Sequence, residues 1–397
     1  MARSIRTYVL LLFSCLGACP YCAVARAEHK PIDPPLAALL PSEQAWLITL
    51  PSPPSAPAAM DDTRVYIPLA GEHFIALNRQ TGATIWSVDI ESAWSPLVRD
   101  GVVYIAASDE LHALDAATGN HKWRVPLPRS PMAALAMTES AIIALVTPDE
   151  VLAFRPVDGS QLWAQSFSGT SGPASLAVDR SRIIVTLGSR VLRVDLANGA
   201  VRWSRTLPGM LRSPVLAGNR VFVGSTDKEL HALNADSGVV DWSFQVGGDV
   251  IGAATVDEAV FVVSLDNVLR ALKQGSGNQV WLQKLTMRPA APPYALGGIV
   301  VVPGMAPPLA TFNAKTGKLI ATLDTTADLP DAKFLAPPLV SSKLTPFAVS
   351  LVAITRDGRA TGHRPVAMLF RDAALVPLTT LPGKPLRKEG STIPRSP

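Results

Sequence analysis

The chain has 397 residues, of which 48% are hydrophobic and 17% charged, and its formal net charge is +4. Ample apolar content with a small net charge argues against a disordered chain. The body has no lysine- and arginine-rich stripe of the kind that binds nucleic acid. The 35 prolines and 27 glycines favour many short strands and turns over long helices.

The first 27 residues have the composition of an export signal. Two arginines precede a short apolar stretch, residues 8–16, which is too short to span a bilayer. Residues 25–27, Ala-Arg-Ala, fit a signal peptidase site that would release a soluble protein. Residues 16–19 instead resemble a bacterial lipobox, which would place a lipid anchor on Cys19. Both alternatives predict a protein that works outside the cytoplasm.

The cysteines add to this prediction. Cys15, Cys19 and Cys22 are the only cysteines, and all lie in or beside the signal. The body therefore has no disulfide, no thiolate metal site and no covalently attached c-type haem. Residues 28–43 are rich in proline and predict a linker, and residues 377–397 predict a flexible tail.

A segment that ends in Gly-x-x-x-Trp recurs along the chain. Its glycines, from Gly82 to Gly317, are 37, 40, 40, 39, 39 and 40 residues apart. Ala321 stands where the last tryptophan is expected, and Trp94 lies outside the series. We predict that each glycine has a positive φ and that each tryptophan is a rigid apolar wedge between repeats. The tryptophans of the series are Trp46, Trp86, Trp123, Trp163, Trp203, Trp242 and Trp281.

Each repeat of about 40 residues contains four short strands separated by turn signals, which is typical of a β-propeller blade. We therefore predict an all-β fold, a single propeller of four-stranded antiparallel blades over residues 44–376. Residues 45–50 resemble a closing strand with no strands before it, and residues 336–370 resemble an incomplete last sheet. Pairing of these two segments would close the ring with eight blades; seven blades is the alternative.

Repeats such as residues 111–123 and 230–242 resemble the PQQ-like, or quinoprotein-type, propeller repeat. Within that group, chain length and export make the protein resemble the BamB-type lipoproteins of outer-membrane protein assembly. The resemblance implies an exported propeller at the periplasmic face of the outer membrane. It also implies a monomer within a complex that binds no cofactor and docks on the protein BamA.

The same resemblance implies that loops between central blades bind the partner. Residues 207–214 resemble one such loop, with Leu211 and Arg212 as a Leu-Arg pair before the next blade. Asp249 resembles an acidic position in the following loop. This chain is shorter than the family around both loops.

The rival interpretation is a PQQ-dependent periplasmic dehydrogenase, which would hold its quinone beside Ca²⁺ in the channel. Asp109, Asp227 and Asp266 recur at one repeat position, with Asp149 similarly placed, which indicates turn chemistry and not a single asymmetric site. Ca²⁺ takes about six to eight oxygen ligands, and we find no such set in the sequence.

Other catalytic and metal-binding patterns are equally weak. His112 and His231 share a repeat position and are predicted to be strand residues. The remaining histidines show no ligand spacing; they are His29, His73, His121 and His363. We therefore predict a scaffold with no catalytic, cofactor-binding or metal-binding residues. A propeller that binds another envelope protein or a glycan is a further alternative.

Overall fold

The computed structural model describes residues 42–377, except 72, 147–149, 168–171, 297, 306–308, 324–335, 337, 341–347, 366–367 and 372–373. All regular secondary structure in these residues is β-strand, which confirms the all-β prediction. Within the same ranges, no helix has the length and apolar character needed to cross a membrane. The export signal, Cys19 and His29 lie outside the described residues.

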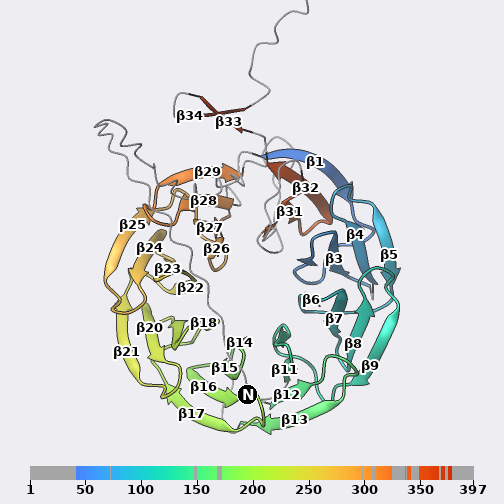
Figure 1. Ribbon diagram of the computed structural model, residues 1–397, viewed down its shortest axis with the longest axis horizontal. Coiled ribbons are helices and arrows are strands. Elements are labelled where there is room, and N and C mark those ends of the chain that lie inside the picture. The colour runs from blue at the N-terminus through green and yellow to red at the C-terminus, as the bar shows by residue number, and fades with distance from the viewer. Residues whose placement is uncertain are drawn as a thin grey trace, which may run out of the picture. The chain divides into compact units, whose positions relative to one another are not determined.

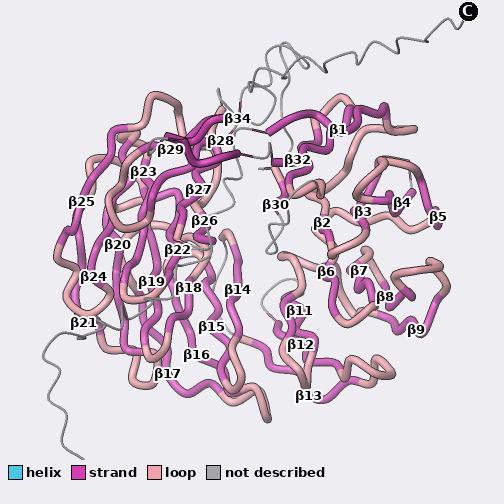
Figure 2. Tube along the Cα trace, turned by 45° about the horizontal axis from the view of Figure 1, so that its top comes forward, coloured by secondary structure: helices cyan, strands magenta, loops and turns pink. Residues whose placement is uncertain are grey.

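The strands form eight four-stranded antiparallel sheets, which are arranged as blades around a central opening (Figures 1 and 2). The first strand of a blade lies innermost and the fourth outermost, as Figure 1 shows.

The first four blades comprise β2 (Ala59–Met60), β3 (Arg64–Leu69), β4 (His73–Asn78) and β5 (Thr84–Val88); β6 (Leu97–Arg99), β7 (Val102–Ala106), β8 (Glu110–Asp115) and β9 (His121–Pro126); β10 (Ala136–Met137), β11 (Ile142–Val146), β12 (Glu150–Phe154) and β13 (Gln161–Ser166); and β14 (Ala174–Val178), β15 (Arg182–Leu187), β16 (Arg190–Asp195) and β17 (Val201–Thr206).

The last four blades comprise β18 (Val215–Ala217), β19 (Arg220–Gly224), β20 (Glu229–Asn234) and β21 (Val240–Gln245); β22 (Val250–Val256), β23 (Ala259–Ser264), β24 (Val268–Lys273) and β25 (Gln279–Lys284); β26 (Tyr294–Leu296), β27 (Ile299–Pro303), β28 (Leu309–Asn313) and β29 (Leu319–Leu323); and β30 (Leu339–Val340), β31 (Leu351–Ile354), β32 (Arg359–Pro365) and β1 (Ser42–Thr49).

The eighth blade joins the two ends of the repeat region. Strand β1 pairs with β32 in an antiparallel register that places Trp46 opposite Gly362. This pairing confirms eight blades and excludes the alternative of seven. The last strand of the ring ends at Pro365, and a separate two-stranded sheet follows, formed by β33 (Met368–Arg371) and β34 (Ala374–Pro377).

The burial of a strand follows its place within the blade. Second and third strands such as β11 and β12 are buried along most of their length, because the neighbouring blades cover both of their faces. Outermost strands such as β9 alternate between half-buried and exposed residues. Eight hydrophobic clusters of described residues each lie between two adjacent blades. The core is therefore divided among the blade interfaces.

The tryptophan series packs between blades, as predicted. The ring of Trp86 lies against Gly119 of the next blade, where an added Cβ would come within 2.8 Å of the ring atom Cδ2. Its Nε1 donates a hydrogen bond of 3.0 Å to the carbonyl oxygen of Ala116. Gly119 has a φ of +76°, so the turn favours glycine for its backbone as well as for space. The other pairs are Trp46–Gly82, Trp123–Gly159, Trp163–Gly199, Trp203–Gly238, Trp242–Gly277 and Trp281–Gly317.

Ring closure explains why Ala321 breaks the series. Each tryptophan contacts the turn between the third and fourth strands of the next blade. In the blade after Ala321 these two strands are β32 and β1, which come from opposite ends of the repeat region and have no connecting turn. A tryptophan at this position would therefore have no glycine turn to pack against.

Candidate partner-binding face

The loops between blades and the turns between second and third strands lie on the same side of the ring. The second and fourth strands of an antiparallel blade run in the same direction, so both end on one side. We call this side the loop face. It carries both predicted loops, residues 207–214 between β17 and β18 and residues 246–249 between β21 and β22.

The loop 207–214 is fixed by hydrogen bonds to its neighbours. The backbone N–H of Met210 donates to Thr226 Oγ1 at 2.9 Å, and Ser225 Oγ donates to the carbonyl oxygen of Pro208 at 2.6 Å. The N–H of Arg212 donates to the carbonyl oxygen of Gly224 at 2.8 Å. A loop held by such bonds presents its side chains in one arrangement.

The side chains of this loop differ in how far they are exposed to solvent. Leu211 is only 3% exposed and belongs to the hydrophobic cluster that contains Trp203 and Val221. Met210 is 45% exposed. A partner that docks on this loop would therefore meet Met210 and not Leu211, because the leucine side chain is part of the core.

Arg212 occupies a bridging position between blades. Its Nε donates to the carbonyl oxygen of Val250 at 3.1 Å. Trp94 has the corresponding position three inter-blade loops earlier, where its Nε1 donates to the carbonyl oxygen of Pro131 at 3.2 Å. Within the residues that the structure describes, the terminal nitrogens of Arg212 make no hydrogen bond or ion pair. The guanidinium is thus anchored through Nε and has donors left for a partner.

Asp249 directly precedes Val250, the residue that Arg212 contacts. The carbonyl oxygen of Asp249 accepts a hydrogen bond of 2.9 Å from the N–H of Leu265, and the N–H of Gly247 donates to Asp266 Oδ2 at 3.0 Å. The structure thus connects the two predicted loops through the Arg212–Val250 bond and ties the second loop to the β23–β24 turn.

The recurring aspartates Asp227 and Asp266 have the turn role predicted for them. Asp227 Oδ1 accepts a hydrogen bond of 2.9 Å from the N–H of Glu229. Asp266 Oδ1 accepts one of 3.2 Å from the N–H of Val268. Burial alone would raise the pKa of Asp266, but hydrogen bonds from Arg270 and Ser264 outweigh it and hold the pKa below its usual value. Asp109 lies in the corresponding turn, where its carbonyl oxygen accepts from Leu127; Asp149 lies outside the described residues.

At one such turn, three side chains of the kinds that bind metal ions lie close together. Ligand atoms of Asp227, Glu229 and His231 lie within 4.8 Å of one another. Both ring nitrogens of His231 already have protein partners, Asp227 Oδ2 at 3.3 Å and Ser243 Oγ at 2.9 Å. In the next blade Arg270 takes the place of His231 and pairs with Asp266. In both blades, therefore, a side chain of the third strand binds the aspartate of the preceding turn and holds the turn against that strand.

One contact between histidines is not visible in the sequence pattern. His112 and His231 are buried strand residues, as predicted. The structure also brings His121 against His112, with 3.2 Å between their ring nitrogens. Their separation of nine residues fits no ligand motif, and the contact follows from the pairing of β8 with β9. The contact could therefore be predicted only once the register of these two strands is known.

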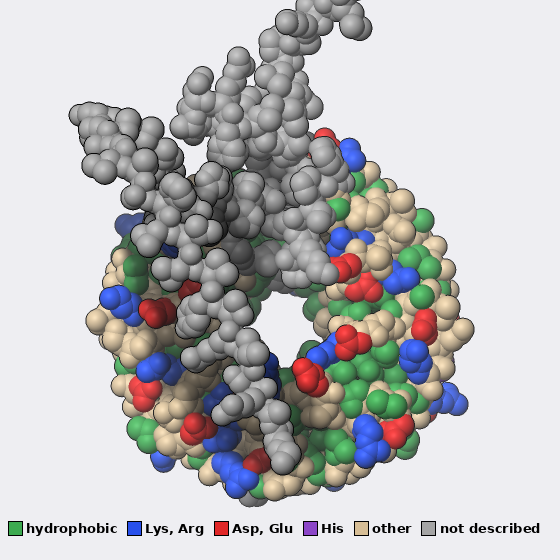
Figure 3. All heavy atoms as spheres, in the orientation of Figure 1, with side chains coloured by type: hydrophobic (Ala, Val, Ile, Leu, Met, Phe, Trp, Pro, Cys, Tyr) green, Lys and Arg blue, Asp and Glu red, His purple; other side chains and the backbone are tan. Residues whose placement is uncertain are grey.

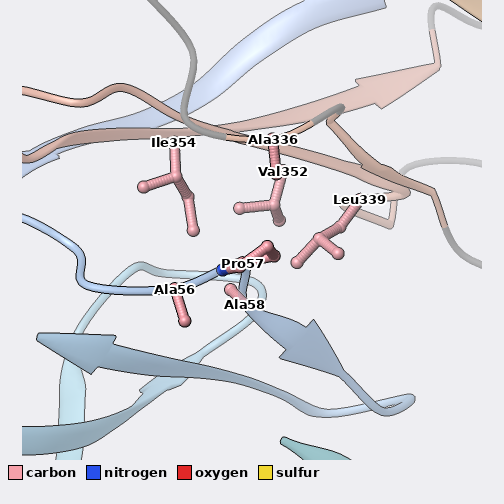
Figure 4. A pocket seen from close by; sticks show the side chains of 7 residues that line it. All are labelled: Ala56, Pro57, Ala58, Ala336, Leu339, Val352 and Ile354. Atoms are coloured by element: carbon pink, nitrogen blue, oxygen red, sulfur yellow. The ribbon is translucent and has the colours of Figure 1, made fainter. Parts of the chain in front are cut away.

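A small apolar crevice lies where the last sheet meets the first blade (Figure 4). Residues 56–58 form one wall, and side chains of β30 and β31, with Ala336, form the other. All lining side chains are aliphatic. They offer no group for acid–base or metal chemistry, so we assign no reaction to the crevice.

The charges of the ring surface are mixed. Figure 3 shows one face, on which acidic and basic side chains are interspersed around the central opening. An interspersed pattern of this kind does not form a single-sign field across the displayed face.

These features define a β-propeller built from PQQ-like repeats. The chain belongs to the family described as outer membrane protein assembly factor BamB, which matches residues 38–185, 147–255, 188–330 and 245–393. This family membership confirms the resemblance found in the sequence.

Individual relatives are more distant. The chain is 24% identical over 193 residues to the outer membrane protein assembly factor BamB of Yersinia pestis, an alignment that covers 44% of this chain and 49% of that protein. It is 28% identical over 167 residues to the serine/threonine-protein kinase AfsK of Streptomyces griseus, covering 39% of this chain and 16% of the kinase. The chain thus spans about half or less of each curated relative.

A solved structure agrees with the fold. The crystal structure of BamB from Moraxella catarrhalis superimposes with a TM-score of 0.61 and 17% identity, covering 81% of this chain and 99% of that one. At this identity the likeness shows the shared propeller alone.

Proposed function

We propose that the protein is an exported, non-enzymatic scaffold that docks on BamA during the assembly of outer-membrane β-barrel proteins. Family membership supports a scaffold role, and the fixed loop face supports docking. The observation that carries the proposal is Arg212, whose guanidinium is anchored through Nε to Val250 and keeps its terminal donors available. Export, with or without a lipid on Cys19, is part of the same proposal.

The loop face also offers apolar anchors. Met210, Leu265 and Met305 are 45%, 39% and 65% exposed, and all three lie in loops or second-to-third-strand turns of this face. Together with Arg212 and Asp249 they form what we call the docking patch. Methionine and arginine side chains are enriched in protein interfaces, in which a few anchor residues supply most of the affinity.

A copurification experiment tests the proposal. Envelopes that contain the C-terminally tagged protein would be solubilised in mild detergent, and copurifying proteins identified by mass spectrometry. We expect strong enrichment of BamA. If BamA is absent under conditions that preserve its complex, the proposed function fails.

Two variants locate the contact. Arg212→Glu and Met210→Asp change a half-buried and an exposed group of the docking patch and should lower BamA enrichment at least about tenfold. Val157→Asp is the matched control, because Val157 is 83% exposed in a turn between third and fourth strands on the opposite side. Equal losses in the variants and the control would remove the docking patch from the proposal.

A further inference from the structure

Two histidines of the second blade face each other across neighbouring strands. Nδ1 of His112, on β8, lies 3.2 Å from Nε2 of His121, on β9. The ring centroids are 5.4 Å apart and the ring planes meet at 55°. The His112 side chain is 7% exposed, whereas His121 is exposed. One ligand nitrogen is therefore fixed by the core, and the other reaches it from the surface.

The spacing of these nitrogens suits a shared metal ion. Histidine nitrogens lie about 2.0–2.1 Å from zinc. Two such ligands are about 3.3–3.4 Å apart at a tetrahedral angle and about 2.9 Å apart at a right angle. The observed 3.2 Å, at which the two rings share a hydrogen bond, lies between these values. An ion would replace that hydrogen bond and leave the nitrogens at about their present separation.

Glu110 sets the orientation of the buried ring. Its Oε2 lies 3.5 Å from Nε2 of His112, the nitrogen that does not face His121. A carboxylate in this place favours the proton on Nε2, as in many zinc sites, so that the lone pair of Nδ1 faces His121. Glu110 also lies 3.9 Å from Arg124, so its charge offsets that of the guanidinium.

His121 faces His112 through Nε2. It can bind a metal through this nitrogen when its proton is carried on Nδ1.

We propose that Nδ1 of His112 and Nε2 of His121 form a two-histidine site for a borderline divalent cation such as Zn²⁺. Water completes the coordination, and Glu110 is the positioning residue. The site is distinct from the Asp227, Glu229 and His231 group, which lies in the fifth blade. It is also separate from the docking patch.

Zinc titration of the full chain tests this site. The protein would be prepared without a histidine tag, stripped with EDTA, and alkylated at its three cysteines, because thiolates bind zinc. Competition with a chromophoric chelator should show one bound Zn²⁺ per chain. His121→Ala should weaken the affinity at least about tenfold, and Glu110→Gln by about tenfold. Because His121 is exposed, its variant should keep the native circular dichroism spectrum.

Two control variants separate this site from other ligands. His73 is an exposed histidine that pairs with Asp89 at 3.2 Å, so His73→Ala should bind zinc as the wild type does. Glu229→Ala should also leave the affinity unchanged. Lack of zinc binding by the wild type would overturn the proposal, as would equal affinity in the wild type and His121→Ala. Loss of binding in Glu229→Ala, with His121→Ala unaffected, would assign the ion to the turn of the fifth blade and would equally overturn it.

Discussion

The contact between a turn glycine and a tryptophan is the smallest unit that explains this fold. Gly238 has a φ of +70°, and an added Cβ would lie 2.6 Å from Cδ2 of Trp203. The glycine is thus required for backbone conformation and for space at once. This double requirement is why the repeat could be recognised from its sequence, since no other residue satisfies both conditions.

Substitution of this glycine should destabilise the protein. We expect Gly238→Ala to cost about 2–4 kcal/mol in the free energy of unfolding, because left-handed strain adds to overpacking against Trp203. Gly275→Ala is the matched control, since nothing lies within 4 Å of its added Cβ and its φ is not positive. Urea denaturation would measure both. Similar midpoints for the two variants would contradict the role of the contact.

His112 predicts how stability depends on pH. Burial holds its pKa below the ordinary value of 6.5, so the unfolded chain binds this proton more readily than the folded one. The contribution to stability is therefore complete above pH 6.5 and is lost as the pH falls toward the folded pKa. In the presence of EDTA, the urea concentration at the unfolding midpoint should be lower at pH 5 than at pH 7.

Replacement of His112 should reduce that fall. Leu152 and Leu192 occupy the same position in the third strands of the next two blades, so His112→Leu places a residue that this repeat position accepts. The variant should show a smaller difference in urea midpoint between pH 7 and pH 5. An unchanged pH dependence would mean that other groups cause it.

At the scale of the element, the eighth blade depends on contacts between distant parts of the chain. Trp46 of β1 packs on Gly82 of the first blade, and its Nε1 donates to the carbonyl oxygen of Arg79 at 2.9 Å. The N–H of Val349 donates to Gln80 Oε1 at 2.8 Å, so the same turn is bound from the other terminal segment as well. Closure by non-covalent pairing makes this seam the place where the ring can open.

Trp46→Ala should therefore weaken the ring more than loss of an exposed contact would. Trp46 is 8% exposed, and truncation of a buried tryptophan costs about 3–5 kcal/mol. Limited proteolysis should cut first near residues 50–58, between β1 and β2. Trp94→Ala, in a half-buried loop position, is the comparison. Initial cleavage elsewhere would show that another seam opens first.

The same closure marks the limit of prediction from the sequence. Strands that follow a recognisable turn could be predicted. The Asp100-Gly101 turn before β7 is an example, because both residues are common at positive φ in such turns and both have positive φ here. The strand β32 could not be assigned, because its outer partner β1 lies some 300 residues away in the numbering and no turn connects them. Its register depends on a non-local pairing that no adjacent residue encodes.

For the whole molecule, the ring converts loops from successive blades into one surface. The sequence predicted the loop 207–214 but not which of its side chains faces outward, since Leu211 and Met210 are both apolar and only the hydrophobic cluster between blades decides that Leu211 is buried. Leu265 and Met305 were missed for the same reason. They join the docking patch because their turns lie on the loop face, far from residues 207–214 in sequence.

The extent of the docking patch gives the last prediction. If the partner spans several blades, Met305→Asp should reduce BamA copurification at least about tenfold even though Met305 lies two blades beyond the loop 207–214 and its neighbour β18. The added carboxylate would have to be desolvated in the interface, whereas at 65% exposure it should not disturb the free protein. Val157→Asp again reports the effect of an acid on the opposite side. Loss with Met210→Asp but none with Met305→Asp would confine the contact to the central blades.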